Sequence, residues 1–396
     1  MRITDNHSVL MMVILAVSAG LLNPLLAQVV SHNVSCRNSK GEPVEWFIIY
    51  KVPESADNEL PGFHKGPVYD RGTEFGYFDS TMGHDAALAD GTGGIAVEKN
   101  NPLATSLAQI FRMSRVQANK RLTYIVYNDQ PPTEDGALVK RWKGVRSLSS
   151  GHSKGVVVLG AQTGLWLMHS IPHFPAGLFK GRYSYPSSGH VNGQTAICVT
   201  FNSSQIDTVA AHLRIQQPHL YESSASEAFR KQHPELDQLL KKNFTSRAPF
   251  VLKGYLIGAD GTKFTLIAKS KRLNEDIYRN VIAPILKSDI YVETWRNGPG
   301  GKLSSDCKAP YHVLDVENIA IGIGNKTVRW SSSEDHSKWA LADNTDWICI
   351  CSINRMISQF RRGGEAMCLQ HQRLHKIFQK GIAGYEPCPK AKPSEN

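Results

Sequence analysis

The stretch Ser149-Ser150-Gly151-His152-Ser153-Lys154-Gly155 leads directly into Val156-Val157-Val158-Leu159. This β-branched apolar run predicts a buried strand over 155–159. About half of the chain later, Ser333-Glu334-Asp335-His336-Ser337-Lys338-Trp339 repeats the His-Ser-Lys sequence. Because residues i and i+2 of an extended strand point to the same face, each copy presents one imidazole and one ammonium group together.

Two copies at this separation are typical of an internal duplication. The middle residue is Ser both times, and both copies follow a Ser-rich turn. With 15 His in the chain, about one His-x-Lys is expected by chance. The alternative interpretation is therefore a pair of exposed turns that carry His and Lys without a catalytic role.

A doubled His-Lys pair suits the cleavage of a phosphodiester without a metal ion. Two Lys can hold the non-bridging oxygens of the phosphate. One His can attack phosphorus while the other protonates the leaving oxygen, and an unperturbed pKa of about 6.5 suits both tasks. We therefore select His152, Lys154, His336 and Lys338 as candidate catalytic residues and expect best activity below neutral pH.

The sequence resembles the deoxyribonuclease II family, a branch of the phospholipase D superfamily. The similarity extends from about Cys36 to Cys388 and keeps its motifs in order. The matching stretches are 43–53 (Pro-Val-Glu-Trp-Phe-Ile-Ile-Tyr-Lys-Val-Pro), 127–132 (Tyr-Asn-Asp-Gln-Pro-Pro), 151–155, 165–172 (Leu-Trp-Leu-Met-His-Ser-Ile-Pro), 193–195 with Cys198, 334–339, 353–355 (Ile-Asn-Arg) and 362–364 (Arg-Gly-Gly).

This resemblance implies an α+β fold of the phospholipase D type, a pseudo-dimer whose two lobes each hold a mixed β-sheet flanked by helices. It also implies an acid-active endonuclease that acts on DNA without metal or other cofactor and leaves 3′-phosphate and 5′-hydroxyl ends. By analogy with the superfamily, His152 is the nucleophile that forms a phosphohistidine and His336 is the general acid. The residues themselves do not distinguish DNA from RNA, nor do they indicate the oligomeric state.

Seven Cys are present, and behind an export signal disulfides are expected. The sequence contains no Cys-x-x-Cys, the spacing typical of a zinc site, so we do not expect one. The family resemblance implies the pairs Cys36–Cys198, Cys307–Cys388 and Cys349–Cys368. Cys351 is then left over, as a buried thiol, a free thiol or a link to another chain.

Residues 1–27 are typical of a signal peptide. Their apolar run over 9–22 is too short to span a bilayer, and no later segment predicts a membrane span. Export fits the four N-glycosylation sequons, and we expect a lysosomal or a secreted, venom-type protein. The sequons begin at Asn33, Asn202, Asn243 and Asn325.

The formal net charge of +10 favours polyanionic partners such as DNA. The length predicts two lobes, which we place at 28–215 and 216–396. Strands are predicted over 44–52, 122–127, 165–168, 196–201, 250–257, 263–268, 290–295 and 347–353, and helices over 101–114, 273–286 and 369–379. The region 54–94 is predicted to be a long loop.

Two further residues are candidates for contact with substrate. Asn128 begins a turn, Asn-Asp-Gln-Pro-Pro, whose role is either structural or substrate binding. His169 closes the strand over 165–168, where it either contacts substrate, tunes His152 or is a structural histidine.

The chain departs from the family pattern at four places. Gly160 stands where Asp is common, and Asp there would orient an imidazole or Lys. Cys351-Ser352 replaces Gly-Asp, Glu365 replaces Gly, and Ala340 follows Trp339. Two other functions are therefore kept: a catalytically impaired secreted DNA-binding protein or toxin on the same fold, and a phospholipase D-type phosphodiesterase. The latter usually has an Asp after each His-x-Lys, and the two copies do not both have it.

Overall fold

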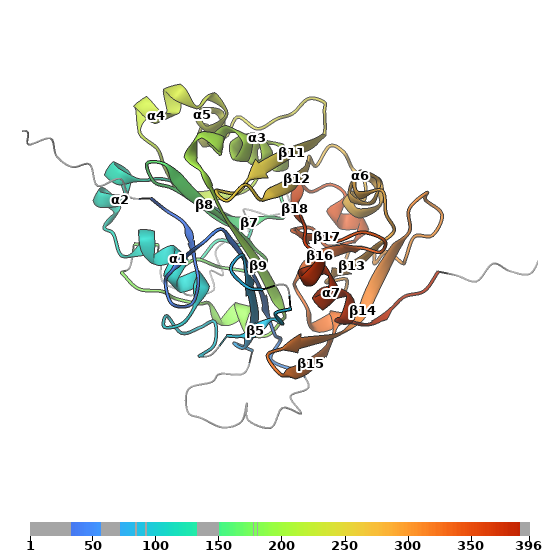
Figure 1. Cartoon of the computed structure of the whole chain (residues 1–396). Coiled ribbons are helices and arrows are strands. Elements are labelled where there is room, and N and C mark those ends of the chain that lie inside the picture. Colours follow the sequence, from blue (N-terminus) through green and yellow to red (C-terminus); the bar gives the residue numbers. More distant parts are fainter. Residues whose placement is uncertain are drawn as a thin grey trace, which may run out of the picture. The chain divides into compact units, whose positions relative to one another are not determined.

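A computed structural model describes residues 33–56, 72–83, 85–91, 93–132, 150–176, 178–179 and 181–388. Residues His32–Asn396 form one compact unit. The predicted signal peptide, residues 1–27, lies outside the described residues. Two large β-sheets dominate the unit, one built from the blue and green part of the chain and one from the yellow to red part (Figure 1).

The first sheet has eight strands, and each pair of neighbours is antiparallel. Its central strand β3 is buried on both faces, as the apolar residues on both sides of 44–52 predicted. A short ribbon of β1 (Cys36–Arg37) and β2 (Pro43–Val44) precedes it. In spatial order the sheet contains β10 (Leu220–Ser224), β6 (Thr123–Asn128), β7 (Lys154–Leu159), β8 (Thr163–His169), β9 (Gln194–Asn202), β3 (Trp46–Lys51), β4 (Phe75–Asp79) and β5 (Ala89–Asp90).

The second sheet has nine strands and is mixed, because β13 and β14 pair in parallel. In spatial order it contains β11 (Val251–Ile257), β12 (Lys263–Lys269), β18 (Gly364–Gln370), β17 (Trp347–Cys351), β16 (Lys338–Ala342), β13 (Ile290–Thr294), β14 (Val313–Ile323) and β15 (Lys326–Ser331), and β19 (Ile382–Tyr385) pairs with β14.

The two sheets repeat one arrangement. The order β6-β7-β8-β9-β3 of the first sheet corresponds to β13-β16-β17-β18-β12 of the second. The registers agree as well, since Asn128 pairs with Lys154 in one sheet and Thr294 pairs with Lys338 in the other. The predicted duplicated α+β fold is confirmed, although only the second of the two sheets is mixed.

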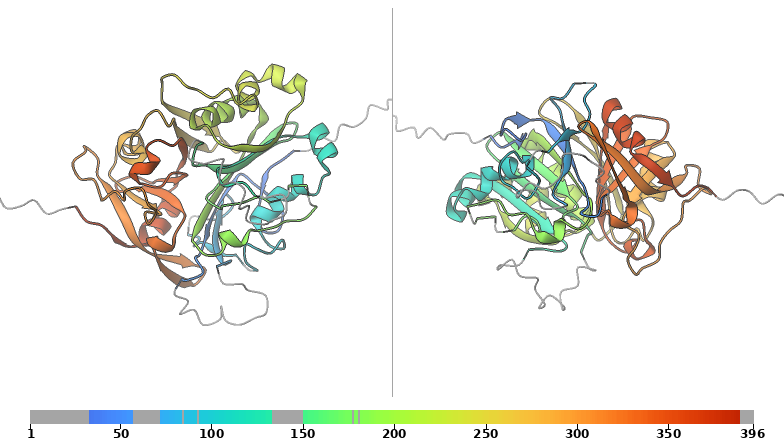
Figure 2. Two further views of the ribbon diagram at one scale, coloured as in Figure 1. Left: turned by 180° about the vertical axis from the view of Figure 1, so that it is seen from behind. Right: turned by 90° about the horizontal axis from the view of Figure 1, so that it is seen from below.

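Helices lie outside and between the sheets (Figures 1 and 2). Outside the first sheet are α1 (Pro102–Phe111), which Asn101 caps, and α2 (Arg115–Arg121). The π-helical turn η5 (Tyr278–Ile282) and α6 (Ala283–Leu286) pack on the outer side of the second sheet. The remaining helices are α3 (Ile206–Gln216), α4 (Glu227–Gln232), α5 (Pro234–Leu240), α7 (Gln372–Lys380) and the 3₁₀ turns η3 (Ser187–Gly189), η4 (Ser203–Gln205), η6 (Ser332–Glu334) and η7 (Ile357–Gln359).

The largest hydrophobic core lies between the sheets and joins the two halves. Both sheets contribute to it, as do the apolar faces of α3 and α7. Phe378 of α7, for example, contacts both Tyr50 of β3 and Trp339 of β16. Each sheet covers its other face with a core of its own. The two sheets therefore share a core. The strand β10 follows residue 215, the predicted end of the first lobe, yet pairs with β6 of the first sheet.

Some predicted elements differ from the structure. The predicted loop over 54–94 contains β4 and β5. The helix predicted from 273 begins at Tyr278, because Asp276 accepts a hydrogen bond from the Tyr278 amide and Asn274 adopts a positive φ of 53°. Residues 369 and 370, predicted to begin the last helix, end β18 instead.

The features expected of an exported protein are present in part. The three disulfides Cys36–Cys198, Cys307–Cys388 and Cys349–Cys368 are the pairs that the resemblance implied, and Cys351 is a buried free thiol. The side chains of the four sequon residues, at 33, 202, 243 and 325, are exposed. Within the described residues, no helix has the length and apolar character needed to cross a membrane.

Candidate active site

The two His-Lys motifs occupy equivalent places in the two sheets. Lys154 is the first residue of β7 and Lys338 is the first residue of β16. His152 and His336 each lie two residues earlier, in the segment that leads into the strand. Both Lys are almost fully buried, with 4% and 5% exposure, whereas both His retain partial exposure.

Each motif is anchored on the opposite half of the molecule. The His152 amide donates a hydrogen bond to the Gly363 carbonyl at 2.8 Å, and the His336 amide donates one to the Gly193 carbonyl at 2.8 Å. Glycine is required for this close approach: a Cβ on Gly193 would collide with the Asp335 carboxylate, and one on Gly363 would collide with a backbone carbonyl. The crossed hydrogen bonds hold both motifs at the junction of the halves.

The pKa shifts of His152, His336 and Lys338 agree with a shared cluster of the four side chains. Burial lowers the pKa of Lys338 to about 7, and the charge of Lys154 adds to this effect. Burial lowers the pKa of His336 to about 3, with further contributions from Lys338 and Lys154. Burial also lowers the pKa of His152, and the charges of Lys154 and Lys338 act in the same direction. Groups from opposite halves affect one another in this way only when they lie close together.

Asp129 organises the first half of the site. Its carboxylate accepts hydrogen bonds from Lys154 Nζ and, at 2.9 Å, from Arg362 Nη2, while His152 Nε2 lies 3.8 Å from Oδ2. Burial alone would raise the pKa of Asp129, but the attraction of Lys154, His152 and Arg362 lowers it below its ordinary value. Asp129 is therefore a buried carboxylate that partly neutralises the cations around it.

Arg362 links Asp129 to the segment before His152. Its Nε donates to the Ser150 carbonyl at 3.2 Å and its Nη2 to the Gly151 carbonyl at 3.3 Å. No role was predicted for Asp129 or Arg362 from the sequence. Both are charged residues inside stretches that match the family, at 127–132 and 362–364, and this could have marked them as site residues.

The second half of the site has a different environment. The edge of the Trp295 ring contacts His336, with 4.9 Å between ring centroids. Lys338 Nζ donates to the His336 carbonyl oxygen. The nearby Asp335 is engaged elsewhere, because its Oδ2 accepts from Tyr50 Oη at 2.6 Å and from Trp330 Nε1 at 2.8 Å.

The structure separates the two candidate substrate-binding residues. Asn128 is fully buried, donates to the Ile171 and Phe174 carbonyls and accepts from the Gln130 amide. Its amide is committed to backbone groups, so we interpret Asn128 as a residue that shapes the loop rather than one that contacts substrate. His169 Nδ1 accepts from the Ile171 amide at 3.2 Å, and its Nε2 has no hydrogen-bond partner among the described residues.

His169 belongs to the same electrostatic cluster. Burial and the charge of Lys154 lower the pKa of His169 to about 3, so it is neutral beside Lys154 near neutral pH. Its ring packs against Phe174. A neutral His169 can donate or accept one hydrogen bond through Nε2, which keeps it a candidate for contact with substrate.

The expected effect of Gly160 on His152 is wrong. Gly160 lies in the β7–β8 turn, where its amide donates to the Thr163 carbonyl at 2.9 Å. The strand β7 separates it from Lys154, and its six residues span about 20 Å. The residue type at position 160 therefore has no direct contact with the His-Lys cluster.

The other departures are accommodated. Glu365 accepts hydrogen bonds from Gln216 and Tyr127, and burial raises its pKa to about 7. Ser352 accepts from the Glu365 amide at 2.9 Å, just as Ser170 accepts from the Thr195 amide at 3.0 Å in the first half. The described residues contain no group of three or more His, Cys, Asp or Glu side chains that could hold a metal ion.

Two matched sheets, each supplying one His-Lys pair to a shared cluster, define a protein of the phospholipase D-like class. Residues 35–388 match the family model described as Deoxyribonuclease II. The chain belongs to the deoxyribonuclease II family, and it is a hydrolase of the deoxyribonuclease II type.

Curated relatives cover nearly the whole chain. Plancitoxin-1 from Acanthaster planci is 31% identical over 360 residues, which are 90% of this chain and 93% of that protein. Deoxyribonuclease-2-alpha from Sus scrofa is 31% identical over 376 residues, 95% of this chain and 96% of that protein. Deoxyribonuclease-2 from Caenorhabditis elegans is 32% identical over 366 residues, 87% of this chain and 91% of that protein.

Proposed function

We propose that this protein is a metal-independent acid endodeoxyribonuclease that hydrolyses DNA through a phosphohistidine and leaves 3′-phosphate and 5′-hydroxyl ends. The observation that carries the proposal is the convergence of His152, Lys154, His336 and Lys338 at the junction of the two halves. The names of the relatives, deoxyribonuclease-2-alpha and deoxyribonuclease-2, support DNA as the substrate.

The two lysines bind the scissile phosphate in this proposal. Lys154 and Lys338 are both buried, and the charge of Lys154 lowers the pKa of Lys338, so a bound phosphodiester anion relieves an existing repulsion. Charge stabilisation of this kind is strong in a site that excludes water. The lysines thereby take the place that metal ions occupy in other phosphoryl-transfer enzymes.

Cleavage then proceeds in two displacements. In the first, a lone pair of neutral His152 forms a bond to phosphorus, the bond from phosphorus to O5′ breaks, and His336 gives its proton to O5′. In the second, His336 takes a proton from water, the water oxygen bonds to phosphorus, and the bond from phosphorus to His152 breaks. One water is consumed, and the product strand retains the 3′-phosphate.

The pKa shifts favour activity in acid. Burial holds the pKa of His152 well below its ordinary value, so the nucleophile stays neutral at acid pH. His336 must be protonated, and since its pKa is lowered to about 3 without substrate, its protonated fraction rises as the pH falls. The negative charge of bound DNA opposes this lowering and raises the pKa of His336 towards the acid pH at which we expect activity.

We propose that the protein is exported, as a secreted or lysosomal glycoprotein. Three disulfides and four exposed sequon residues support this fate. The signal peptide at 1–27, the lobes at 28–215 and 216–396, and glycosylation at Asn33, Asn202, Asn243 and Asn325 remain parts of the proposal. Mass spectrometry of the exported protein before and after enzymatic deglycosylation checks the cleavage site and the occupied sequons.

The other functions have less support. The impaired DNA-binding protein or toxin was favoured by Gly160, which lies at the far end of β7 from the cluster. The name of plancitoxin-1 is a reason to keep a toxin role in view, but that role does not require the loss of catalysis. For the phospholipase D-type phosphodiesterase, the Asp that usually follows each pair is present only once, because Asp343 lies five residues after Lys338 whereas Leu159 lies five residues after Lys154.

Plasmid nicking tests the proposal. The purified protein is incubated with supercoiled plasmid at pH 5 in excess EDTA, with a parallel reaction at pH 8. We expect nicking at pH 5 despite the chelator and little at pH 8. Nicking that EDTA abolishes would overturn metal independence. The absence of nicking at both pH values, with DNA binding intact, would favour the impaired protein.

A further inference from the structure

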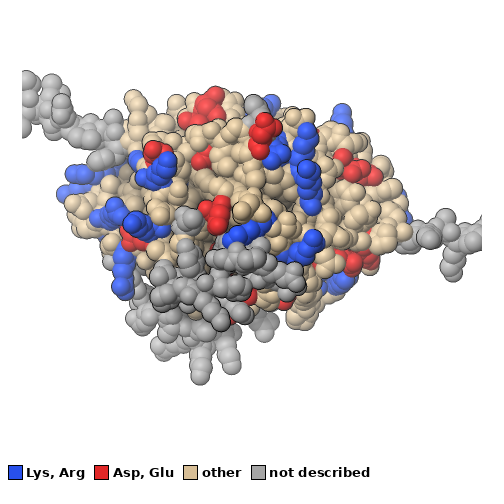
Figure 3. Space-filling model, turned by 60° about the horizontal axis from the view of Figure 1, so that its bottom comes forward, with Lys and Arg blue, Asp and Glu red and all other residues tan. Residues whose placement is uncertain are grey.

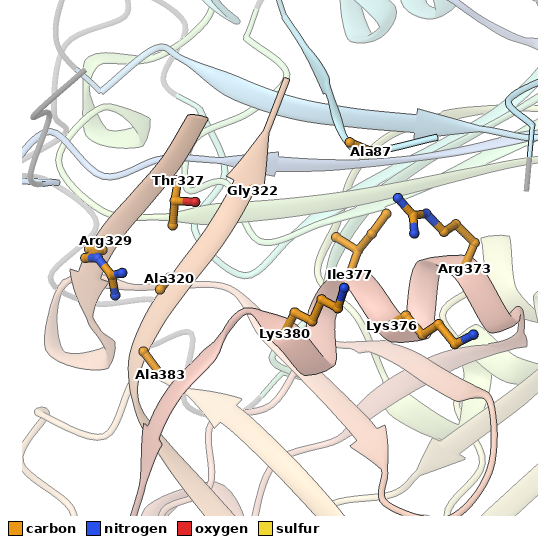
Figure 4. Close-up of a pocket in the computed structure, with 10 residues that line it drawn as sticks. All are labelled: Ala87, Ala320, Gly322, Thr327, Arg329, Arg373, Lys376, Ile377, Lys380 and Ala383. Atoms are coloured by element: carbon orange, nitrogen blue, oxygen red, sulfur yellow. The ribbon is translucent and has the colours of Figure 1, made fainter. Parts of the chain in front are cut away.

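A pocket of about 470 Å³ lies beside α7, β14 and β15, away from the His-Lys cluster. Its wall carries four cationic side chains: Arg329 from β15, and Arg373, Lys376 and Lys380 from α7 (Figure 4). The other lining residues are Ala87, Ala320, Gly322, Thr327, Ile377 and Ala383. None of the described residues that line this pocket is acidic. We call it the α7 pocket.

The cations of the α7 pocket have no carboxylate partner within the part of the chain that the structure describes. Arg373 donates to the Ala86 carbonyl at 2.6 Å and to the Asp85 carbonyl at 2.9 Å. These acceptors are neutral, so Arg373 is held in place with its charge intact.

Three of the cations share one face of α7. Positions 373, 376 and 380 are spaced by three and four residues, which brings them to one side of a helix. Like charges at this spacing repel and destabilise a helix. The inner side of α7, with Leu374 and Phe378, already packs in the core between the sheets, so the cations add nothing to that packing. A bound anion would compensate their repulsion.

Figure 3 shows one face of the molecule, on which Lys and Arg side chains form separate groups with Asp and Glu side chains among them. The α7 pocket instead gathers four cations around one hollow without an acidic side chain in its described lining. This concentration distinguishes it from an ordinary solvated charged surface.

The spacing of the cations fits a polymer of phosphates better than a single ion. From 373 to 380 an α-helix rises about 10 Å. Successive phosphates of one DNA strand rise about 3.4 Å, so the row faces about three phosphates. Arg329 lies across β14 from this row, on the other side of the pocket (Figure 4).

A second pocket leads from the α7 pocket towards the second motif. It shares Arg329 and Ala383 with the α7 pocket and is also lined by Ser331 and Glu334. Glu334 lies two residues before His336, and its carbonyl accepts the Gly193 amide hydrogen bond at 2.8 Å. The second pocket therefore places Arg329 of the α7 pocket in the same hollow as Glu334, in the segment that precedes His336.

We propose that the α7 pocket is a second contact site for the DNA backbone, which binds phosphates outside the bond that is cleaved. This inference rests on the proposed function, because it takes DNA as the substrate. Its role is to hold long DNA on the enzyme, whereas Lys154 and Lys338 act on the scissile phosphate.

The test removes three charges from the pocket and, in a matched control, three from elsewhere. The pocket variant is Arg329→Gln/Lys376→Gln/Lys380→Gln, and Arg373 is kept because it bonds to the neighbouring loop. The control variant, Lys40→Gln/Lys120→Gln/Lys287→Gln, changes three exposed cations outside the pocket. Both are combined with His336→Ala to prevent cleavage, and binding of a fluorescein-labelled DNA duplex is measured by anisotropy at several salt concentrations at pH 5.

We expect the pocket variant to bind the duplex about 10-fold or more weakly and its salt slope to fall by about 3, one for each lost phosphate contact. The control should change much less. Equal effects in both variants, or no effect in either, would overturn the proposal. Loss of inorganic phosphate binding with duplex binding unchanged would overturn DNA as the occupant.

A cleavage assay separates this inference from the proposed function. Without His336→Ala, the pocket variant should show a raised KM for long DNA and an unchanged rate on bis(p-nitrophenyl) phosphate, which is too small to reach the α7 pocket. An unchanged KM for long DNA would contradict the pocket role. If the unmodified protein cleaves neither substrate, the proposed function fails, and the anisotropy comparison still decides whether the pocket binds DNA.

Discussion

The two halves of the site hold the same His-Lys pair in different surroundings. In the first half, β6 ends at Asn128 and Asp129 follows, where it contacts Lys154 and faces His152. In the second half, β13 ends at Thr294 and Trp295 follows, where its ring contacts His336. A carboxylate in one half thus corresponds to an aromatic ring in the other.

The difference extends to the neighbouring residue of each strand. Tyr127 of β6 corresponds to Glu293 of β13. Tyr127 accepts a hydrogen bond from Trp166 and donates one to Glu365. Glu293 is fully buried, neither of its carboxyl oxygens has a hydrogen-bond partner among the described residues, and burial raises its pKa well above its ordinary value. Among the described residues, Asp129 forms ion pairs with His152 and Lys154, whereas no carboxylate forms an ion pair with His336 or Lys338.

A duplicated site with unequal halves can divide the chemistry. A buried carboxylate beside His152 stabilises the positive charge that develops on that imidazole when it bonds to phosphorus. Burial and the charges of Lys338 and Lys154 lower the pKa of His336, which makes it a stronger acid once it is protonated. This contrast supports His152 as nucleophile and His336 as general acid.

The first prediction concerns both histidines and has the largest effect. His152→Ala and His336→Ala should each reduce plasmid cleavage by about 10⁴-fold or more. The double variant should be no slower than the slower of the two single variants, because the effects of substitutions at residues that act as a unit are not additive. Rates of nicking at pH 5 check this. Substantial activity in either single variant would show that the halves work independently.

The second prediction compares Asp129 with Trp295. Asp129→Asn should reduce kcat by about 10² to 10³-fold, since it leaves Lys154 and Arg362 without their buried counter-charge. Trp295→Phe keeps an aromatic ring beside His336 and should cost less than about 10-fold. Steady-state kinetics and melting temperatures of both variants decide. Equal losses would mean that the two environments contribute alike.

The third prediction uses the lowered pKa of Lys338. Because that pKa is about 7, Lys338 is charged in acid and loses its charge as the pH rises through 7, and phosphate binding is lost with it. Arg keeps its charge across this range. Lys338→Arg should therefore extend KM-limited activity to higher pH. Burial lowers the pKa of Lys154 as well, but Asp129 opposes that shift, so Lys154→Arg should extend the activity less. The pH profile of kcat/KM measures this, and an unshifted alkaline limb in Lys338→Arg would refute it.

Local sequence patterns gave the strands but not the contacts between distant segments. The β-branched run at 155–159 and the apolar residues on both sides of 44–52 identified β7 and β3, because the pattern that marks a buried strand is local in the sequence. The strand β14 was not predicted, although Val316, Ile319, Ile321 and Ile323 are buried along it and carry a partial signal of alternation. The hydrogen bond from Arg362 to Asp129 joins residues 233 positions apart, and no local pattern indicates it.

The candidate site was predictable where the motif carried the chemistry. His152, Lys154, His336 and Lys338 were selected because their residue types and spacing repeat, and the structure brings them together. The sequence left the roles of Asn128 and Gly160 open, because they depend on which backbone groups lie nearby and on the length of β7. Spacing along a chain does not show which end of a strand faces the site.

Cleavage of DNA with a bridging sulfur at the 5′ position of the scissile bond tests the division of labour most directly. A thiolate leaves without protonation, so a variant that lacks the general acid should recover activity on this substrate. We predict that, in a single turnover, His336→Ala releases the 5′-thiol strand of the sulfur-substituted DNA at close to the wild-type rate, while His152→Ala remains inactive on it. Recovery in His152→Ala and not in His336→Ala would contradict the assignment and exchange the roles of the two halves.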